Sequence, residues 1–105
     1  MVTVDTGHCT ASGLEPAAMV EALGSRVGNV HLKDHIGCES VALGRGHTPN
    51  LEVLRQLKAL NYAGDITVEL EVHDRENAVR YVRDSHPYVH GLIVAASETP
   101  LPLLT

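Results

Sequence analysis

Three short segments rich in β-branched residues, each followed by a polar loop and a helix-like stretch, constrain the fold of this chain most strongly. The three segments are 2–5, 27–33 and 66–72. Their branched side chains favour strands, because they pack well on a pleated surface. Strands that alternate with helices along a chain form parallel sheets with right-handed crossovers. The sequence therefore predicts an α/β protein with three parallel strands.

Helix signals follow each predicted strand. Pro16 suits the first turn of a helix, and Gly24 suits the position just after its last turn. Asn50 is a favoured N-cap, and the leucines that follow it recur at three- and four-residue spacing. Asp74 predicts the start of a final helix, which we expect to end near Ser85 because a His-Pro pair follows.

The remaining segments are predicted to be loop and tail. Residues 34–48 contain three glycines and little hydrophobic periodicity, which indicates a long loop of the kind that is often functional. Residues 1–95 are predicted to form one domain, and residues 96–105, with two prolines, a C-terminal tail. A chain of 105 residues is near the size at which a single core becomes stable.

Composition narrows the classes of function. A net charge of −5 argues against binding to a phosphate backbone, and three Tyr without Phe or Trp offer no stacking surface for bases. No apolar run approaches the ~20 residues of a membrane span, and the first residues do not resemble a signal peptide. Cys9 and Cys38 show no C-x-x-C spacing, which fits a reducing compartment. We therefore expect a cytoplasmic protein with neither a nucleic-acid nor a membrane partner.

A side chain able to bind a metal ion stands at or near the end of each predicted strand. These residues are Asp5, His31 and Glu69, and they are spaced by roughly the 30 residues of a β/α unit in an eight-stranded barrel. The carboxyl ends of parallel strands meet at one edge of a sheet, so the three side chains are predicted to lie together. Their mixed oxygen and nitrogen donors suit Mn²⁺, Mg²⁺, Co²⁺ or Zn²⁺.

Such an ion polarises a carbonyl group and stabilises an enediolate while a nearby base moves a proton. Glu69 is a candidate for both roles, as a ligand and as the proton-transfer group. His8, one turn beyond Asp5, is a candidate for hydrogen bonding to a substrate oxygen.

Each of these residues also has a structural interpretation. Asp5 fits a cap of the turn that follows it, and His31 fits a hydrogen-bonded core histidine. Glu69 fits an exposed carboxylate or one paired with a lysine or arginine, and Asp34 fits an acceptor of loop amides. The histidines without ligand spacing are predicted to be surface or loop residues: His35, His47, His73, His86 and His90. Cys9 is predicted to be a small packed residue.

Four short motifs occur in order along the chain. They are Asp5-Thr-Gly-His8, His31-Leu-Lys-Asp34, Leu43-Gly-Arg-Gly46 and the stretch from Tyr62 to Glu69. In this order and spacing they resemble the xylose isomerase-like TIM-barrel superfamily, and in particular its sugar phosphate isomerase/epimerase branch. That branch includes ketose 3-epimerases, hydroxypyruvate isomerases and inosose dehydratases. The resemblance covers about residues 2–82 and implies the C-terminal three β/α units of a (β/α)8 barrel, hence an incomplete barrel.

The resemblance implies that Asp5, His31 and Glu69 bind a divalent metal ion, that His8 contacts the substrate and that Glu69 transfers a proton. The implied activity is isomerisation or epimerisation of a small sugar, sugar phosphate or hydroxy-carbonyl compound. The family has a fourth ligand, a catalytic glutamate on an earlier strand, and no residue before Asp5 supplies it. We therefore expect the chain to be inactive alone, and to associate with itself or with an N-terminal half-barrel that covers its open strand edges.

Two other functions remain open. A metal-dependent phosphodiesterase of the endonuclease IV type shares the fold, but it needs further His and Glu ligands and a basic face for DNA. The net charge of −5 and the lack of a further histidine in the Leu43–Gly46 loop count against it. The third alternative is a non-catalytic piece of a truncated barrel.

Overall fold

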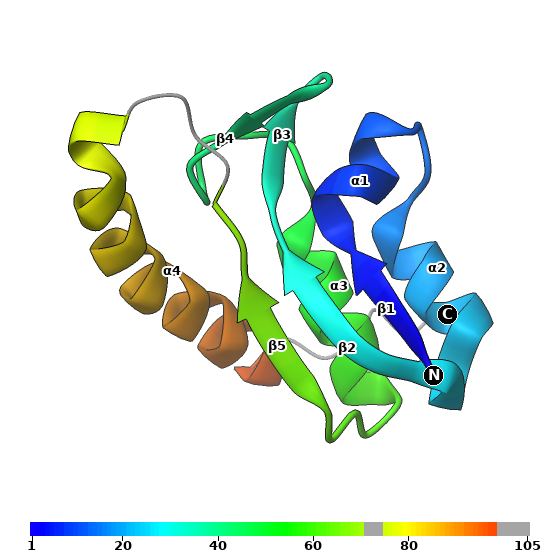
Figure 1. Cartoon of the computed structure of the whole chain (residues 1–105). Helices are drawn as coiled ribbons and strands as arrows, with labels where there is room; N and C mark the ends of the chain where they lie inside the picture. Colours follow the sequence, from blue (N-terminus) through cyan, green and yellow to red (C-terminus); the bar gives the residue numbers. More distant parts are fainter. Residues whose placement is uncertain (71–74, 99–105) are drawn as a thin grey trace.

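Three parallel strands form the central sheet of the protein in a computed structural model (Figure 1). The strands are β1 (Val2–Asp5), β2 (Val27–Leu32) and β5 (Asp65–Val68), and they lie in the order β1-β2-β5. The structure describes residues 1–70 and 75–98. Within them the sheet does not close into a barrel. The α/β class and the parallel strands are confirmed.

In the described part of the chain, four helices accompany the sheet, together with two short 3₁₀ turns, η1 (Gly24–Arg26) and η2 (Arg75–Asn77). The helices are α1 (Thr6–Ala11), α2 (Pro16–Leu23), α3 (Asn50–Ala59) and α4 (Ala78–Glu98). Both predicted ends of α2 are confirmed: it begins at Pro16, and Gly24 follows with a φ of 54°. Within residues 1–70 and 75–98, no helix combines the length and apolar character that crossing a membrane requires.

The predicted long loop contains a β-hairpin. Strands β3 (Asp34–Ile36) and β4 (Glu39–Val41) pair antiparallel, and Gly37 between them has a φ of 60°. Such a positive φ is accessible to glycine without strain, which permits the tight turn. The hairpin projects from the end of β2, beyond the central sheet (Figure 1).

Three predicted boundaries are wrong. Asn50 is the first residue of α3, and its amide nitrogen donates to the Lys33 carbonyl oxygen at 2.9 Å instead of capping the helix. β5 ends at Val68 and not at Val72; residues 71 and 72 of the expected strand, and Asp74 as the expected start of the last helix, lie outside the described residues. α4 does not end near Ser85 but continues through Pro87, because the part of the helix beyond this proline packs against α3, with Ala96 in the core. Residues 96–98, expected in the tail, belong to this helix.

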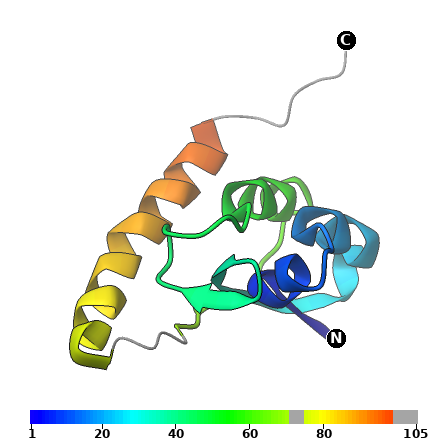
Figure 2. The same ribbon diagram turned by 90° about the horizontal axis from the view of Figure 1, so that it is seen from above.

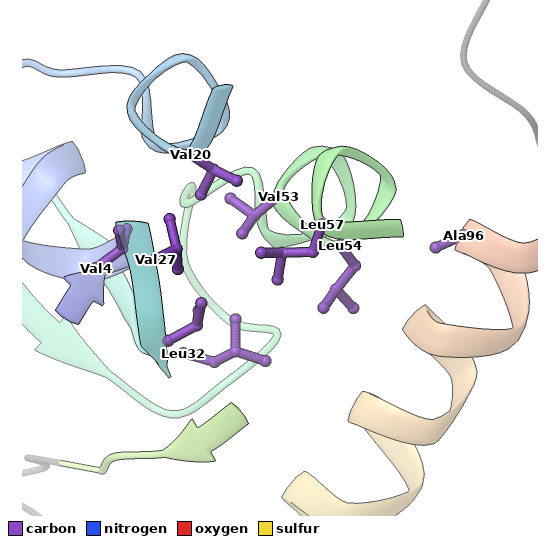
Figure 3. Close-up of a cluster of buried hydrophobic side chains, with 9 residues drawn as sticks. Val4, Val20, Val27, Leu32, Val53, Leu54, Leu57 and Ala96 are labelled. Atoms are coloured by element: carbon purple, nitrogen blue, oxygen red, sulfur yellow. The ribbon is translucent and has the colours of Figure 1, made fainter. Parts of the chain in front are cut away.

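The two faces of the sheet differ sharply. One face packs against α2 and α3 and forms the core, whose buried side chains are Val4, Val20, Val27, Val30, Leu32, Val53, Leu54, Leu57 and Ala96 (Figure 3). Seen from above, α2 and α3 lie on the same side of the sheet and α4 flanks α3 (Figure 2). Side chains alternate along a strand, so the opposite face carries polar residues: Thr3, Asp5, Asn29, His31, Thr67 and Glu69.

Candidate metal centre

The three predicted ligands meet at the carboxyl edge of the sheet. One ligand atom each from Asp5, His31 and Glu69 lies within 4.8 Å of the other two, and all three side chains are half-buried. The strand register explains this meeting, because Asp5 pairs with His31 and the chain of β5 continues past Val68 to Glu69. Oxygen and nitrogen donors bound to one ion at about 2.1 Å stand about 3–4 Å apart, so small side-chain rotations bring this set to a divalent ion.

Asp5 serves the backbone as well as the candidate centre. Its Oδ1 accepts a hydrogen bond from the backbone N–H of His8 at 2.9 Å and thereby caps α1. The structural interpretation of Asp5, as a cap of the turn that follows it, is therefore confirmed. A carboxylate has several lone pairs, so the capping bond leaves Oδ2 available to an ion.

His8 lies beside Asp5 on α1. Its side chain is 70% exposed, and its Nδ1 is 3.9 Å from Asp5 Oδ2. The helix α1 therefore places an accessible imidazole next to the candidate ligands. Its role as a substrate contact stays a prediction.

Glu69 stands between an imidazole and an ammonium group. Its Oε1 is 2.9 Å from His31 Nδ1, and its Oε2 is 3.7 Å from Lys33 Nζ. The Lys33 side chain is only 1% exposed, so its charge acts on Glu69 with little screening by solvent. The structural interpretation of Glu69, as a carboxylate paired with a lysine, is confirmed.

Sequence reasoning missed Lys33. The strand alternation could have indicated it, because Lys33 follows His31 by two residues and so projects from the same side of an extended chain. Thr6 fixes its backbone: the hydroxyl of Thr6 accepts from Lys33 N at 3.0 Å and lies 3.2 Å from Lys33 O.

Asp34 organises the loop beside the centre and is not one of the clustered ligands. Its buried carboxylate accepts four backbone N–H groups, from His35, Gly44, Gly46 and Thr48, at 2.9–3.0 Å. The interpretation of Asp34 as an acceptor of loop amides is confirmed. The four bonds hold the glycine-rich stretch against the end of β2.

The other histidines divide into two groups. His35 is only 4% exposed, because its ring packs directly on the backbone of Gly7, so its prediction as a surface or loop residue is wrong. His47, His86 and His90 are exposed, as predicted. His73 lies outside the described residues.

Cys9 is half-buried and packs against the core, as predicted for a small packed residue. Burial raises the pKa of its thiol, and the negative charge of Asp5 raises that pKa further. At neutral pH the side chain is therefore a thiol, which is a poor nucleophile.

Sequence comparisons give one curated relative of unassigned function. The chain is 37% identical to the uncharacterized protein MJ1311 of Methanocaldococcus jannaschii over 73 residues, which are 65% of this chain and 25% of that protein. No protein-family profile matches the chain. The chain thus corresponds to about a quarter of the length of this relative.

Comparison with solved structures identifies proteins of the same fold. A xylose isomerase domain protein from Planctomyces limnophilus superimposes with a TM-score of 0.77 at 21% identity, over 93% of this chain and 39% of that one. A D-tagatose 3-epimerase-like protein superimposes with a TM-score of 0.64 at 29% identity, over 87% of this chain and 35% of that one. In both cases the chain spans little more than a third of a barrel protein. The fold of this chain therefore fits the xylose isomerase-like TIM-barrel superfamily, and the chain corresponds to part of such a barrel.

Proposed function

We propose that this chain supplies three ligands of a divalent-metal centre to an isomerase or epimerase of a small sugar, sugar phosphate or hydroxy-carbonyl compound. The observation that carries the proposal is the meeting of the Asp5, His31 and Glu69 ligand atoms within 4.8 Å. These atoms lie at the carboxyl edge of parallel strands, where barrel enzymes place their active groups. The similarity to the solved D-tagatose 3-epimerase-like protein supports the reaction class.

We assign a role in binding or proton transfer to each residue of the candidate centre. Asp5, His31 and Glu69 hold the ion, which supplies Lewis-acid stabilisation of an enediolate when bound. Glu69 also takes or returns the proton at the carbon next to the carbonyl group, and Lys33 holds its second oxygen at 3.7 Å. His8, exposed beside Asp5, binds a substrate hydroxyl or carbonyl oxygen.

The proposal includes further strands beside β1. In the order β1-β2-β5, one edge of β1 is open, and a groove of about 290 Å³ runs along it. Apolar side chains such as Val2, Leu14 and Met19 line this groove. We propose that an N-terminal half-barrel, or failing that a second copy of the chain, pairs with this edge and completes the substrate pocket.

Calorimetric titration with Mn²⁺ or Co²⁺ tests the metal centre. We expect one site per chain, and we expect His31→Ala to weaken binding at least tenfold because it removes the nitrogen donor. His86→Ala is the matched control, since His86 lies exposed on α4 and away from the sheet edge. Equal affinity of the His31→Ala variant and the wild type would overturn the assignment.

Deuterium uptake from D₂O tests the reaction class. In a protein that joins this chain to the rest of a barrel, we expect Mn²⁺-dependent exchange at the ketose carbon next to the carbonyl. Glu69→Gln should remove that exchange, because the amide cannot accept the proton. Exchange that persists in Glu69→Gln would contradict the role of Glu69 in proton transfer.

A further inference from the structure

Asn29 faces the second nitrogen of the candidate ligand His31. It precedes His31 by two residues on β2, so both side chains project from the polar face of the sheet. Its Nδ2 lies 3.3 Å from His31 Nε2. On the other side of the ring, His31 Nδ1 lies 2.9 Å from Glu69 Oε1. The imidazole is therefore held between an amide and a carboxylate.

The amide of Asn29 has one atom whose bonding is incomplete. Its Oδ1 is buried and has no hydrogen-bond partner in the part of the chain that the structure describes. Because Oδ1 has no partner, turning the amide breaks no hydrogen bond at this atom.

The chemistry of a neutral imidazole gives each orientation of this amide a hydrogen bond to His31. One ring nitrogen carries a proton and the other a lone pair. Nδ1 is the nitrogen that faces Glu69, so a metal ion held by Glu69 and His31 takes the Nδ1 lone pair and leaves the proton on Nε2. Nε2–H then needs an acceptor, and a half-turn of the Asn29 amide about its Cβ–Cγ bond places the oxygen where the nitrogen was and provides one.

We propose that Asn29 is the positioning residue of His31. Its oxygen accepts from Nε2–H when Nδ1 binds a metal ion, and its NH₂ group donates to Nε2 when Nδ1–H pairs with Glu69. This inference rests on the metal centre proposed above. Partners that orient a metal-bound histidine in this way typically contribute about 10- to 100-fold to metal affinity.

The amide also explains why a carboxylate does not occupy this position. A carboxylate only accepts, so it pairs with the Nε2–H tautomer alone, whereas an amide pairs with both tautomers. Asn29 can therefore form a hydrogen bond with His31 in either tautomer.

Metal affinity is the first test. Co²⁺ binding is measured by calorimetry and by the visible absorption of the bound ion in the wild type, Asn29→Leu and Asn29→Asp. We expect Asn29→Leu to weaken binding about 10- to 100-fold and Asn29→Asp to bind at least as tightly as the wild type. Thr3→Val is the control, because Thr3 pairs with Asn29 in the register and shares its face; we expect affinity within twofold of the wild type. Wild-type affinity in Asn29→Leu would overturn the inference.

The proton position on His31 is the second test, and it does not depend on metal. Two-bond ¹⁵N correlations of the labelled imidazole show which nitrogen carries the proton. Without metal we expect Nδ1–H in the wild type and in Asn29→Leu, and a proton on Nε2 in Asn29→Asp, whose new carboxylate accepts from it. With Zn²⁺ we expect Nε2–H in the wild type.

The two tests separate the two proposals. A wild type that binds no Co²⁺ would overturn the metal centre of the proposed function. An unprotonated Nε2 in metal-free Asn29→Asp would overturn the role of Asn29, whatever the metal result. A purely structural role for Asn29 would change the stability of the protein but not the position of this proton.

Discussion

Replacing Asp34 with asparagine should lower the free energy of unfolding by about 3–6 kcal/mol. Each oxygen of the buried Asp34 carboxylate accepts two backbone N–H groups, Oδ1 from His35 and Thr48 and Oδ2 from Gly44 and Gly46. An asparagine keeps one oxygen and presents an NH₂ group to the other two donors. Hydrogen bonds to charged groups contribute about 1.5–3 kcal/mol each, and two of them are lost.

Urea-induced unfolding, followed by far-ultraviolet circular dichroism, measures this loss. Hydrogen exchange of the Gly44, Gly46 and Thr48 amides should become faster in the same variant, which shows whether the loop opens before the whole protein unfolds. Asp84→Asn is the matched control. Asp84 is 61% exposed and 3.8 Å from Arg80 one turn away, so we expect a loss of about 0.3–0.5 kcal/mol.

One result would refute this reasoning. If Asp34→Asn unfolds within about 1 kcal/mol of the wild type and the three loop amides stay protected, the carboxylate does not hold the loop. A stable variant with unprotected loop amides would instead confirm the bonds and show that loop and core unfold separately.

Three further predictions concern single substitutions and thiol reactivity. Gly46→Ala should cost about 1–3 kcal/mol in the same unfolding assay, because its new methyl group would overlap the Asp34 carboxylate; an unchanged midpoint would contradict this. Iodoacetamide at pH 8 should modify exposed Cys38 before Cys9, because burial raises the pKa of the Cys9 thiol and lowers its thiolate fraction. Mass spectrometry of the modified peptides checks the order, and equal rates would count against it. Pro87→Ala should raise the free energy of unfolding by about 1–3 kcal/mol, since it restores a backbone donor inside α4; a loss of stability would show that the proline fits its site.

The sequence predicts the sheet and the candidate ligands because both depend on local pattern. β-Branched runs mark the strands, and Asp5, His31 and Glu69 stand at their ends. Parallel pairing then brings the three side chains to one edge without any further information. The two ends of helix α2 likewise depend on nearby sequence, since Pro16 and Gly24 mark them.

Tertiary contacts explain the structural features that the sequence did not predict. Helix α1 contains only six residues, including Gly7, and it depends on the Asp5 cap and on the burial of Thr6 against Lys33. α4 passes through Pro87 because its packing on α3 outweighs the missing hydrogen bond. Burial of Lys33 follows from the surrounding helices, which the pattern of β2 alone does not reveal.

The double role of Asp5 limits which residues evolution can place there. The cap of α1 accepts Asp, Asn, Ser or Thr, since each offers a short side-chain oxygen to the His8 N–H. A divalent ion favours a carboxylate, which leaves Asp or Glu. Only aspartate meets both demands. In descendants that lose the metal, drift toward Asn, Ser or Thr would be tolerated while Glu stays rare, so the substitutions found at this position record whether selection still acts on the ion or only on the helix.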